Sequence, residues 1–106
     1  MLYFQKLDVY QRSIELLSLT RRVVAELPKG HSDLADQLRR SAQSIPQNIA
    51  EGCGRTTRAD KARHYTIARG SAMESAAHLD VMRVAEVIEA DAYDRAIELL
   101  ERSWRC

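Results

Sequence analysis

Apolar residues recur at spacings of three and four along most of the chain, which is the period of an amphipathic α-helix. The pattern is interrupted at 28–30, 52–57 and 87–91, where Pro, Gly, Thr and Asp are typical of helix ends. No segment alternates apolar and polar residues as a half-buried β-strand does. The pattern therefore predicts an all-α chain of four helices. Short links favour an antiparallel, up-down-up-down four-helix bundle that forms one domain over residues 1–106.

The first predicted helix begins with Asp8 as its N-cap and ends before Pro28. One of its apolar stripes consists of Leu7, Tyr10, Ile14, Leu17, Val24 and Leu27, and a second beside it of Val9, Leu16, Leu19 and Val23. A lone bundle needs about one apolar face per helix, so the extra stripe indicates a contact between subunits. The alternative is a single wide stripe that faces the core.

The second predicted helix opens near Ser32 and ends at Gly52 or Gly54, either of which can adopt the left-handed conformation. It contains Pro46, which cannot donate the hydrogen bond that the carbonyl of Ala42 would otherwise receive. We expect a kink there, at a cost of about 3 kcal/mol unless neighbours offset it. Polar side chains close enough to supply that repair are Ser44, Gln47 and Asn48, and we expect Ser44 or Asn48 to do so.

The third predicted helix has Thr57 as N-cap with Asp60 three residues later, and it runs towards Val87. Small residues fill its middle at 68–77, and Gly70 among them is expected to mark a tight helix crossing. The fourth helix is capped by Asp91 and places four large side chains on one face. They are Tyr93, Ile97, Leu100 and Trp104.

Charge divides the chain, although the net charge is only +1. Residues 1–70 carry twelve Lys and Arg against seven acids, whereas 71–106 carry four against eight. Arg outnumbers Lys by thirteen to three, which favours bidentate contacts over plain solubilisation. These counts indicate a polarised molecule, unless complementary helix faces simply neutralise each other.

A basic cluster spans the joint between the second and third helices. It consists of Arg55, Arg58, Lys61 and Arg63, followed by His64. Free backbone N–H groups at a helix start favour an anion, so cations there indicate that a negative ligand binds. The alternative is that Arg55 and Arg58 neutralise the carbonyl end of the second helix. We predict contacts to nucleic-acid phosphates without base stacking, with Arg39 and Arg40 as weaker candidates.

Catalytic and metal-binding motifs are absent from the sequence, which has no Gly-x-Ser-x-Gly, Walker, CxxC or HExxH pattern. We therefore predict no enzyme, no cofactor and no metal. Glu51 and Glu74 are expected to pair across helices with an arginine, namely Arg39, Arg40 or Arg69. An enzyme that uses Glu51 and His64 is the remaining alternative.

The chain has no apolar run near the ~20 residues that span a bilayer, and its start lacks the basic and apolar regions of a secretory signal. Cys53 and Cys106 share no motif spacing and suit unpaired thiols in a reducing compartment. The sequence therefore predicts a cytoplasmic protein that does not contact a membrane.

A resemblance rests on the run from Arg39 to Arg55, which contains Ser44-Ile45-Pro46, Asn48-Ile49-Ala50-Glu51-Gly52 and flanking arginines. It resembles the signature of a family of small bacterial four-helix bundle proteins. That family includes proteins encoded in intervening sequences of large-subunit ribosomal RNA genes and the accessory variability determinants of diversity-generating retroelements. Matches at 4–11 and 67–74 extend the resemblance over most of the chain.

The resemblance implies a ring-like homo-oligomer, namely a pentamer, that acts as a non-enzymatic accessory protein. RNA or DNA and a reverse transcriptase are the partners that it implies. It also implies that Pro46, Asn48, Glu51 and Gly52 form a structural motif. The alternative function is a protein-docking scaffold for a partner enzyme, without direct contact to nucleic acid.

Overall fold

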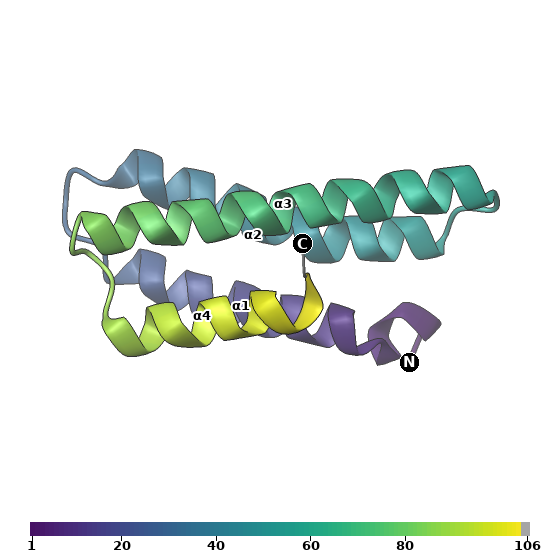
Figure 1. The fold of residues 1–106 in the computed structure, drawn as a ribbon, viewed down its shortest axis with the longest axis horizontal. Coiled ribbons are helices and arrows are strands. Elements are labelled where there is room, and N and C mark those ends of the chain that lie inside the picture. Colours follow the sequence, from purple (N-terminus) through teal and green to yellow (C-terminus); the bar gives the residue numbers. More distant parts are fainter. Residues whose placement is uncertain (105–106) are drawn as a thin grey trace.

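The computed structural model describes residues 1–104, and these residues form helices without any strand. The elements are the 3₁₀ helix η1 (Tyr3–Lys6) and the α-helices α1 (Asp8–Ala25), α2 (Ser32–Cys53), α3 (Arg58–Val84) and α4 (Ala90–Ser103). Figure 1 shows the α1–α2 and α3–α4 connections at one end of the molecule and the α2–α3 connection at the other. The predicted all-α, four-helix bundle is confirmed.

The helix starts follow the sequence in part. Thr57 caps α3 as predicted, and its Oγ1 accepts a hydrogen bond from the Asp60 backbone N–H at 3.1 Å. The other two predicted N-caps are wrong, since Leu7 caps α1 and Glu89 caps α4, neither with a side-chain hydrogen bond. Asp8 and Asp91 lie instead within the first turns, where their charge still complements the helix dipole.

The end of α2 lies at one of the two predicted glycines but in another conformation, and the end of α3 lies earlier than predicted. The cap of α2 is Gly54, but its φ of −85° is right-handed, and the glycine with positive φ is Gly30, at 94°, in the α1–α2 link. The third helix stops at Val84, three residues short of Val87. Two residues later Glu86 adopts a φ of 58°, a left-handed conformation that turns the chain out of the helix.

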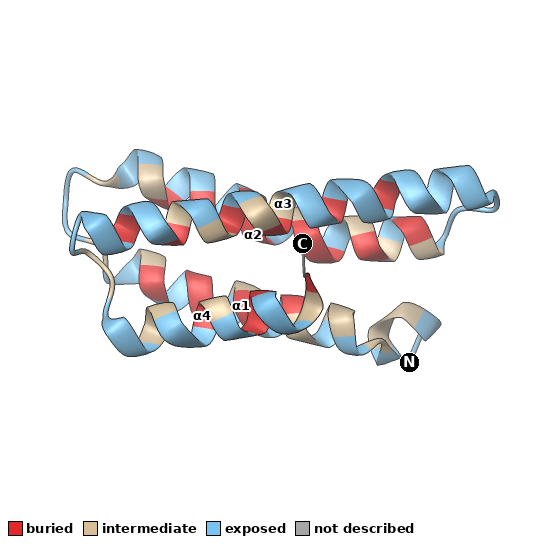
Figure 2. Cartoon of the chain, in the orientation of Figure 1, coloured by how far each residue is buried: buried red, intermediate tan, exposed pale blue. Residues whose placement is uncertain are grey.

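The core lies between all four helices, as the buried bands of Figure 2 show. From α1 it takes Leu16, Leu19 and Val23, which belong to the second apolar stripe. The first stripe lies at the edge of the core, and its Ile14 is 41% exposed. The wide apolar surface of α1 is therefore only partly used within one chain.

The difference in length between α3 and α4 leaves part of the bundle open. With 14 residues, α4 is about half as long as α3, which has 27. In Figure 1, α4 lies beside the C-terminal half of α3 alone. Trp104 follows the last residue of α4, and its ring centroid lies 5.1 Å from that of Tyr65 on α3. The first turns of α3, before Tyr65, project beyond this point together with the end of α2.

Pro46 is buried, and α2 continues through it as one helix. The Asn48 amide does donate to a backbone carbonyl, but to that of Ser44 at 2.9 Å. Among the described residues, no side chain donates to the carbonyl of Ala42, so the expected repair of that group is not observed.

The tight crossing between α2 and α3 is at Gly52, and the prediction that placed it at Gly70 is wrong. A Cβ added to Gly52 would lie 3.1 Å from the Cβ of His64, whereas one added to Gly70 would meet nothing within 4 Å. Gly70 points to solvent because the buried small residues of α3, such as Ala68, Ala72 and Ser75, lie on its other side.

Candidate functional site at the α2–α3 end

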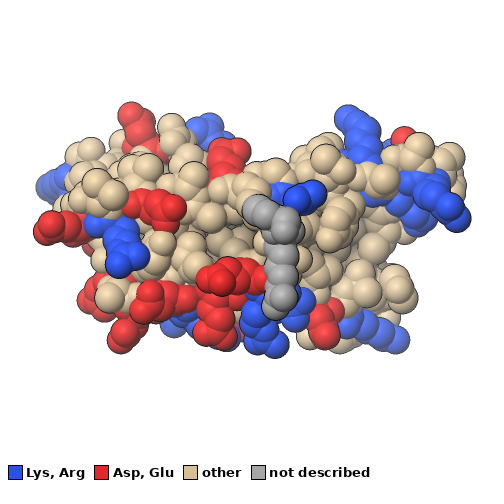
Figure 3. Space-filling model, in the orientation of Figure 1, with Lys and Arg blue, Asp and Glu red and all other residues tan. Residues whose placement is uncertain are grey.

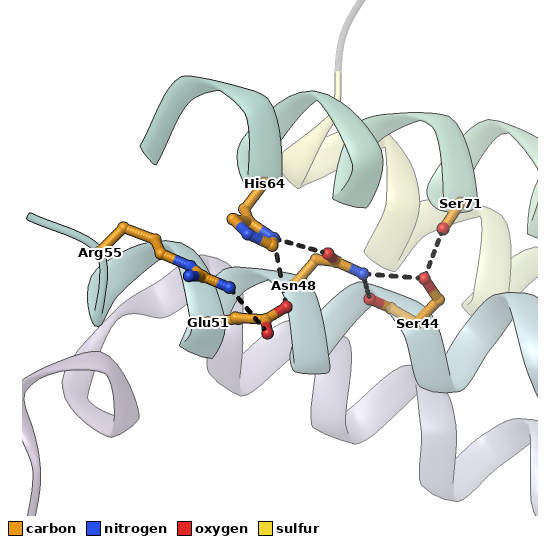
Figure 4. A network of polar contacts seen from close by, with 6 residues as sticks. All are labelled: Ser44, Asn48, Glu51, Arg55, His64 and Ser71. Carbon is orange, nitrogen blue, oxygen red and sulfur yellow. Dashed lines mark hydrogen bonds and ion pairs between the residues drawn. The ribbon is translucent and has the colours of Figure 1, made fainter. Parts of the chain in front are cut away.

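A network of polar side chains joins α2 to α3 near the projecting end of the bundle (Figure 4). His64 of α3 points at α2, where its Nδ1 lies 3.0 Å from Asn48 Oδ1 and 3.3 Å from Glu51 Oε2. Further along the seam, the Ser71 hydroxyl donates to the Ser44 hydroxyl at 2.8 Å. These contacts between the signature on α2 and the facing side chains of α3 fix the relative position of the two helices.

The hydrogen bonds of Asn48 assign the proton on His64. The Nδ2 of Asn48 donates to the carbonyl and the hydroxyl of Ser44, at 2.9 and 3.0 Å, so the Oδ1 of Asn48 is the atom left to accept a hydrogen bond. His64 therefore carries its proton on Nδ1 and donates it to Asn48. The other ring nitrogen, Nε2, is buried and has no hydrogen-bond partner among the described residues.

The acidic residues have other partners than the sequence predicted. Glu51 pairs with Arg55, which lies just past the end of α2, at 3.2 Å and with His64 across the seam. Glu74 contacts His78 at 3.1 Å. Within residues 1–104, neither carboxylate meets an arginine of another helix, because a spacing of four along the chain places Arg55 beside Glu51 and His78 beside Glu74.

The basic cluster lies where the sequence placed it, but its members differ in what they contact. Lys61 Nζ donates to the carbonyl of Cys53 at 3.3 Å, so this lysine occupies the carbonyl end of α2. Arg55 is held by Glu51. Arg58 and Arg63 are exposed and have no carboxylate partner within residues 1–104. These two guanidinium groups are thus available to an external anion.

Figure 3 shows the polarity that the sequence indicates. Lys and Arg gather over the α2–α3 end, and Asp and Glu gather over the half of this face where the α3–α4 connection lies. The weaker candidates Arg39 and Arg40 are exposed in the first half of α2, and Arg39 pairs with Asp36 at 3.4 Å. They do not belong to the α2–α3 end.

A groove of about 500 Å³ lies beside the basic cluster and was not predicted. Its lining combines apolar side chains with cations and aromatic rings, and none of the lining residues is acidic. The lining includes the apolar Leu7, Val9, Ile49 and Ala62, the cations Arg58 and Lys61, and the aromatic Tyr3 and Tyr65. Tyr3 and Tyr65 lie far apart in the sequence, so only the packing of η1 against the bundle could bring them together.

Other kinds of site find less support. Among residues 1–104, no three His, Cys, Asp or Glu side chains are grouped so that they could hold a metal ion. No helix in the same part of the chain is long and apolar enough to cross a membrane. Cys53 forms no disulfide with any described residue, and Cys106 lies outside the described residues.

Comparison with known families gives one match that covers nearly the whole chain. The model of a family described as 23S rRNA-intervening sequence protein matches residues 5–105. No curated protein matches the chain.

Proposed function

This chain belongs to the 23S rRNA-intervening sequence protein family, and from that premise we propose that it is a non-enzymatic accessory protein that associates with nucleic acid. The site is the α2–α3 end, where Arg58, Lys61 and Arg63 contact backbone phosphates and Arg55 assists them. Arg39 and Arg40 are secondary contacts. The fold, the family and the charge distribution support a binding role for a protein of the cytoplasm.

The observation that carries this proposal is the exposure of Arg58 and Arg63 at the first turns of α3 without a carboxylate partner among the described residues. Each guanidinium group can donate two parallel hydrogen bonds to one phosphate. Free N–H groups at the start of α3 add a partial positive charge in the same place. Cations that cost the helix stability are best explained by a ligand that neutralises them.

We also propose that the chain, as an up-down-up-down antiparallel bundle, assembles into a ring-like homo-oligomer, namely a pentamer. The partly exposed first stripe of α1, with Ile14 at 41% exposure, supports a contact between subunits. A ring would present several copies of a weak site and raise the effective concentration of each. This matters because a net charge of +1 per chain gives little long-range attraction.

The alternative function is a protein-docking scaffold for a partner enzyme, such as a reverse transcriptase. It is favoured by two apolar side chains on the last turns of α3, since Val81 is 50% exposed and Val84 is 85% exposed. Exposed apolar residues at neighbouring positions of a helix are a feature of protein contacts.

Binding of fluorescent RNA and DNA over a range of salt concentrations tests the main proposal. The triple variant Arg58→Gln, Lys61→Gln, Arg63→Gln should bind weakly and flatten the salt dependence, because each neutralised phosphate contributes about −0.9 to the slope on duplex DNA. A matched control replaces Arg21, Arg22 and Lys29, three exposed cations of the opposite end, by Gln. Equal affinity of the first triple variant and the wild type would favour the docking alternative.

A further inference from the structure

The groove at the α2–α3 end differs from a plain phosphate-binding surface because it combines cations with exposed aromatic rings. Tyr3 is 73% exposed and Tyr65 is 52% exposed, and both line the groove together with Arg58 and Lys61. Tyr65 is also held in place, since its ring packs against the buried Trp104 at 5.1 Å between centroids. A ring fixed in this way loses little conformational freedom when a flat ligand stacks on it.

We propose that this groove takes an unpaired base of a single-stranded nucleic acid, with Arg58 and Lys61 on the flanking phosphates. The inference rests on the proposed function and goes beyond it, because phosphate contacts alone do not distinguish single strands from duplexes. It departs from the sequence prediction of contacts without base stacking, because Tyr3 lines the groove together with Tyr65. A groove of about 500 Å³ is within the size range of small-ligand sites, roughly 300–1,000 Å³.

The chemistry of the lining matches such an occupant. Leu7, Val9 and Ile49 offer apolar surface to the face of a base, and the tyrosines offer aromatic surface. The two cations have no acidic neighbour in the lining that would compete with a phosphate. A duplex keeps its bases stacked and paired, so it can reach the cations but cannot place a base in the groove.

The polar groups of the groove argue for stacking without sequence reading. Asn48 lines the groove, yet its amide is already committed to Ser44 on one side and to His64 on the other. The amide most suited to reading a base edge is therefore occupied within the protein. We infer that every base is accepted and that the preference is for an unpaired one.

The experiment compares three probes of about ten nucleotides on the full chain: a single-stranded RNA, the same backbone with abasic positions, and an RNA duplex. Fluorescence anisotropy at fixed salt should give the tightest binding for the intact single strand. Tyr3→Leu with Tyr65→Leu keeps an apolar side chain at both positions and removes the aromatic stacking surface. It should weaken single-strand binding by about tenfold or more and leave abasic and duplex binding unchanged.

Tyr93→Leu, an aromatic replacement outside the groove, is the control and should bind all three probes as the wild type does. Circular dichroism and light scattering show whether the double variant keeps its fold and its mass. If the double variant misfolds, the test is the binding of the probes to the wild-type chain. Equal affinity of the wild type for intact and abasic strands overturns the inference.

The remaining outcomes separate the inference from the proposed function. Equal binding of intact and abasic strands that still depends on Arg58 and Lys61 overturns base stacking and leaves phosphate binding in place. Absence of binding to any probe overturns both. A change of oligomer mass in the double variant, with single-strand affinity unaltered, overturns the inference and assigns the groove to a contact between copies of the chain.

Discussion

The seam between α2 and α3 and the seam between α1 and α4 are packed in different ways. Across the α1–α4 seam the interior is apolar, with Leu16, Leu19 and Leu99 buried. Polar contacts between these two helices lie at the edge, such as the 2.7 Å hydrogen bond that Arg12 Nε donates to Ser103 Oγ. This seam is stabilised by the burial of large side chains.

Across the α2–α3 seam, polar pairs lie inside. The hydroxyls of Ser41 and Ser75 are 2.8 Å apart and buried, and further along the seam His64 donates to Asn48. Small side chains let the helices approach closely, so each buried polar group must meet its own partner. An apolar seam tolerates a slide of one helix, whereas this seam specifies a single register. It also positions the basic end and the groove.

Leu16→Ala should have the largest effect, because Leu16 is 1% exposed and the α1–α4 seam depends on filled volume. We expect a loss of about 2–5 kcal/mol in the free energy of unfolding. Urea denaturation followed by circular dichroism measures it, at one fixed protein concentration since an oligomer's stability depends on concentration. Val84→Ala is the control, because Val84 is 85% exposed. Comparable losses in both variants would contradict this description of the core.

Asn48→Ala tests the polar seam and should cost less, about 1–3 kcal/mol. It removes the acceptor of the His64 Nδ1 proton and the donor to Ser44. The other ring nitrogen of His64, Nε2, already has no hydrogen-bond partner among the described residues, so the variant would leave the whole imidazole without the Asn48 contact. Gln47→Ala, at the exposed neighbouring position, should change stability by less than about 0.5 kcal/mol. If Asn48→Ala were as harmless as Gln47→Ala, the buried network would contribute nothing to the seam.

Two glycine substitutions compare a position where α2 and α3 approach closely, Gly52, with one that faces solvent, Gly70. Gly70→Ala should stabilise the chain by up to about 1 kcal/mol, because the added methyl meets nothing within 4 Å and Ala favours the helix. Gly52→Ala offers the same gain in propensity, but its methyl would lie 3.1 Å from the Cβ of His64, which cannot rotate away. We expect the clash to cancel or exceed the gain. Thermal unfolding of both variants measures the contrast, and equal stabilisation would refute the close approach.

Sequence periodicity predicted the four helices because their apolar residues recur at helical spacing. Pro, Gly or Thr mark the α1–α2 and α2–α3 connections, whereas the α3–α4 connection has none of them. The basic cluster was also predictable, since Arg55, Arg58, Lys61 and Arg63 are neighbours along the chain. The pairing of Glu51 with His64 was not, because it depends on the register of two helices. Tyr3 and Tyr65 line the same groove only because η1 packs against the bundle and because α4 is too short to cover Tyr65.

The smallest expected effect concerns a polar contact at the edge of the bundle, between α3 and α4. The Tyr93 hydroxyl donates to the Asp80 carboxylate at 2.5 Å, and the guanidinium group of Arg83 lies 4.8 Å from the centre of the Tyr93 ring. The hydrogen bond to Asp80, followed by burial, raises the pKa of Tyr93 above its ordinary value near 10.

A raised pKa in the folded state means that this contribution to stability is complete below the pKa of the unfolded chain and is lost as pH rises through the folded value. Tyr93→Phe should therefore cost about 1 kcal/mol or less near neutral pH. The difference in stability between this variant and the wild type should shrink above about pH 10. Urea denaturation of both proteins at about pH 8 and about pH 11 measures it. A difference in the free energy of unfolding that stayed constant up to the higher pH would show that ionisation of Tyr93 does not affect folding. The Tyr93–Asp80 contact would then differ from the polar pairs inside the α2–α3 seam, where we expect the loss of a partner to be costly.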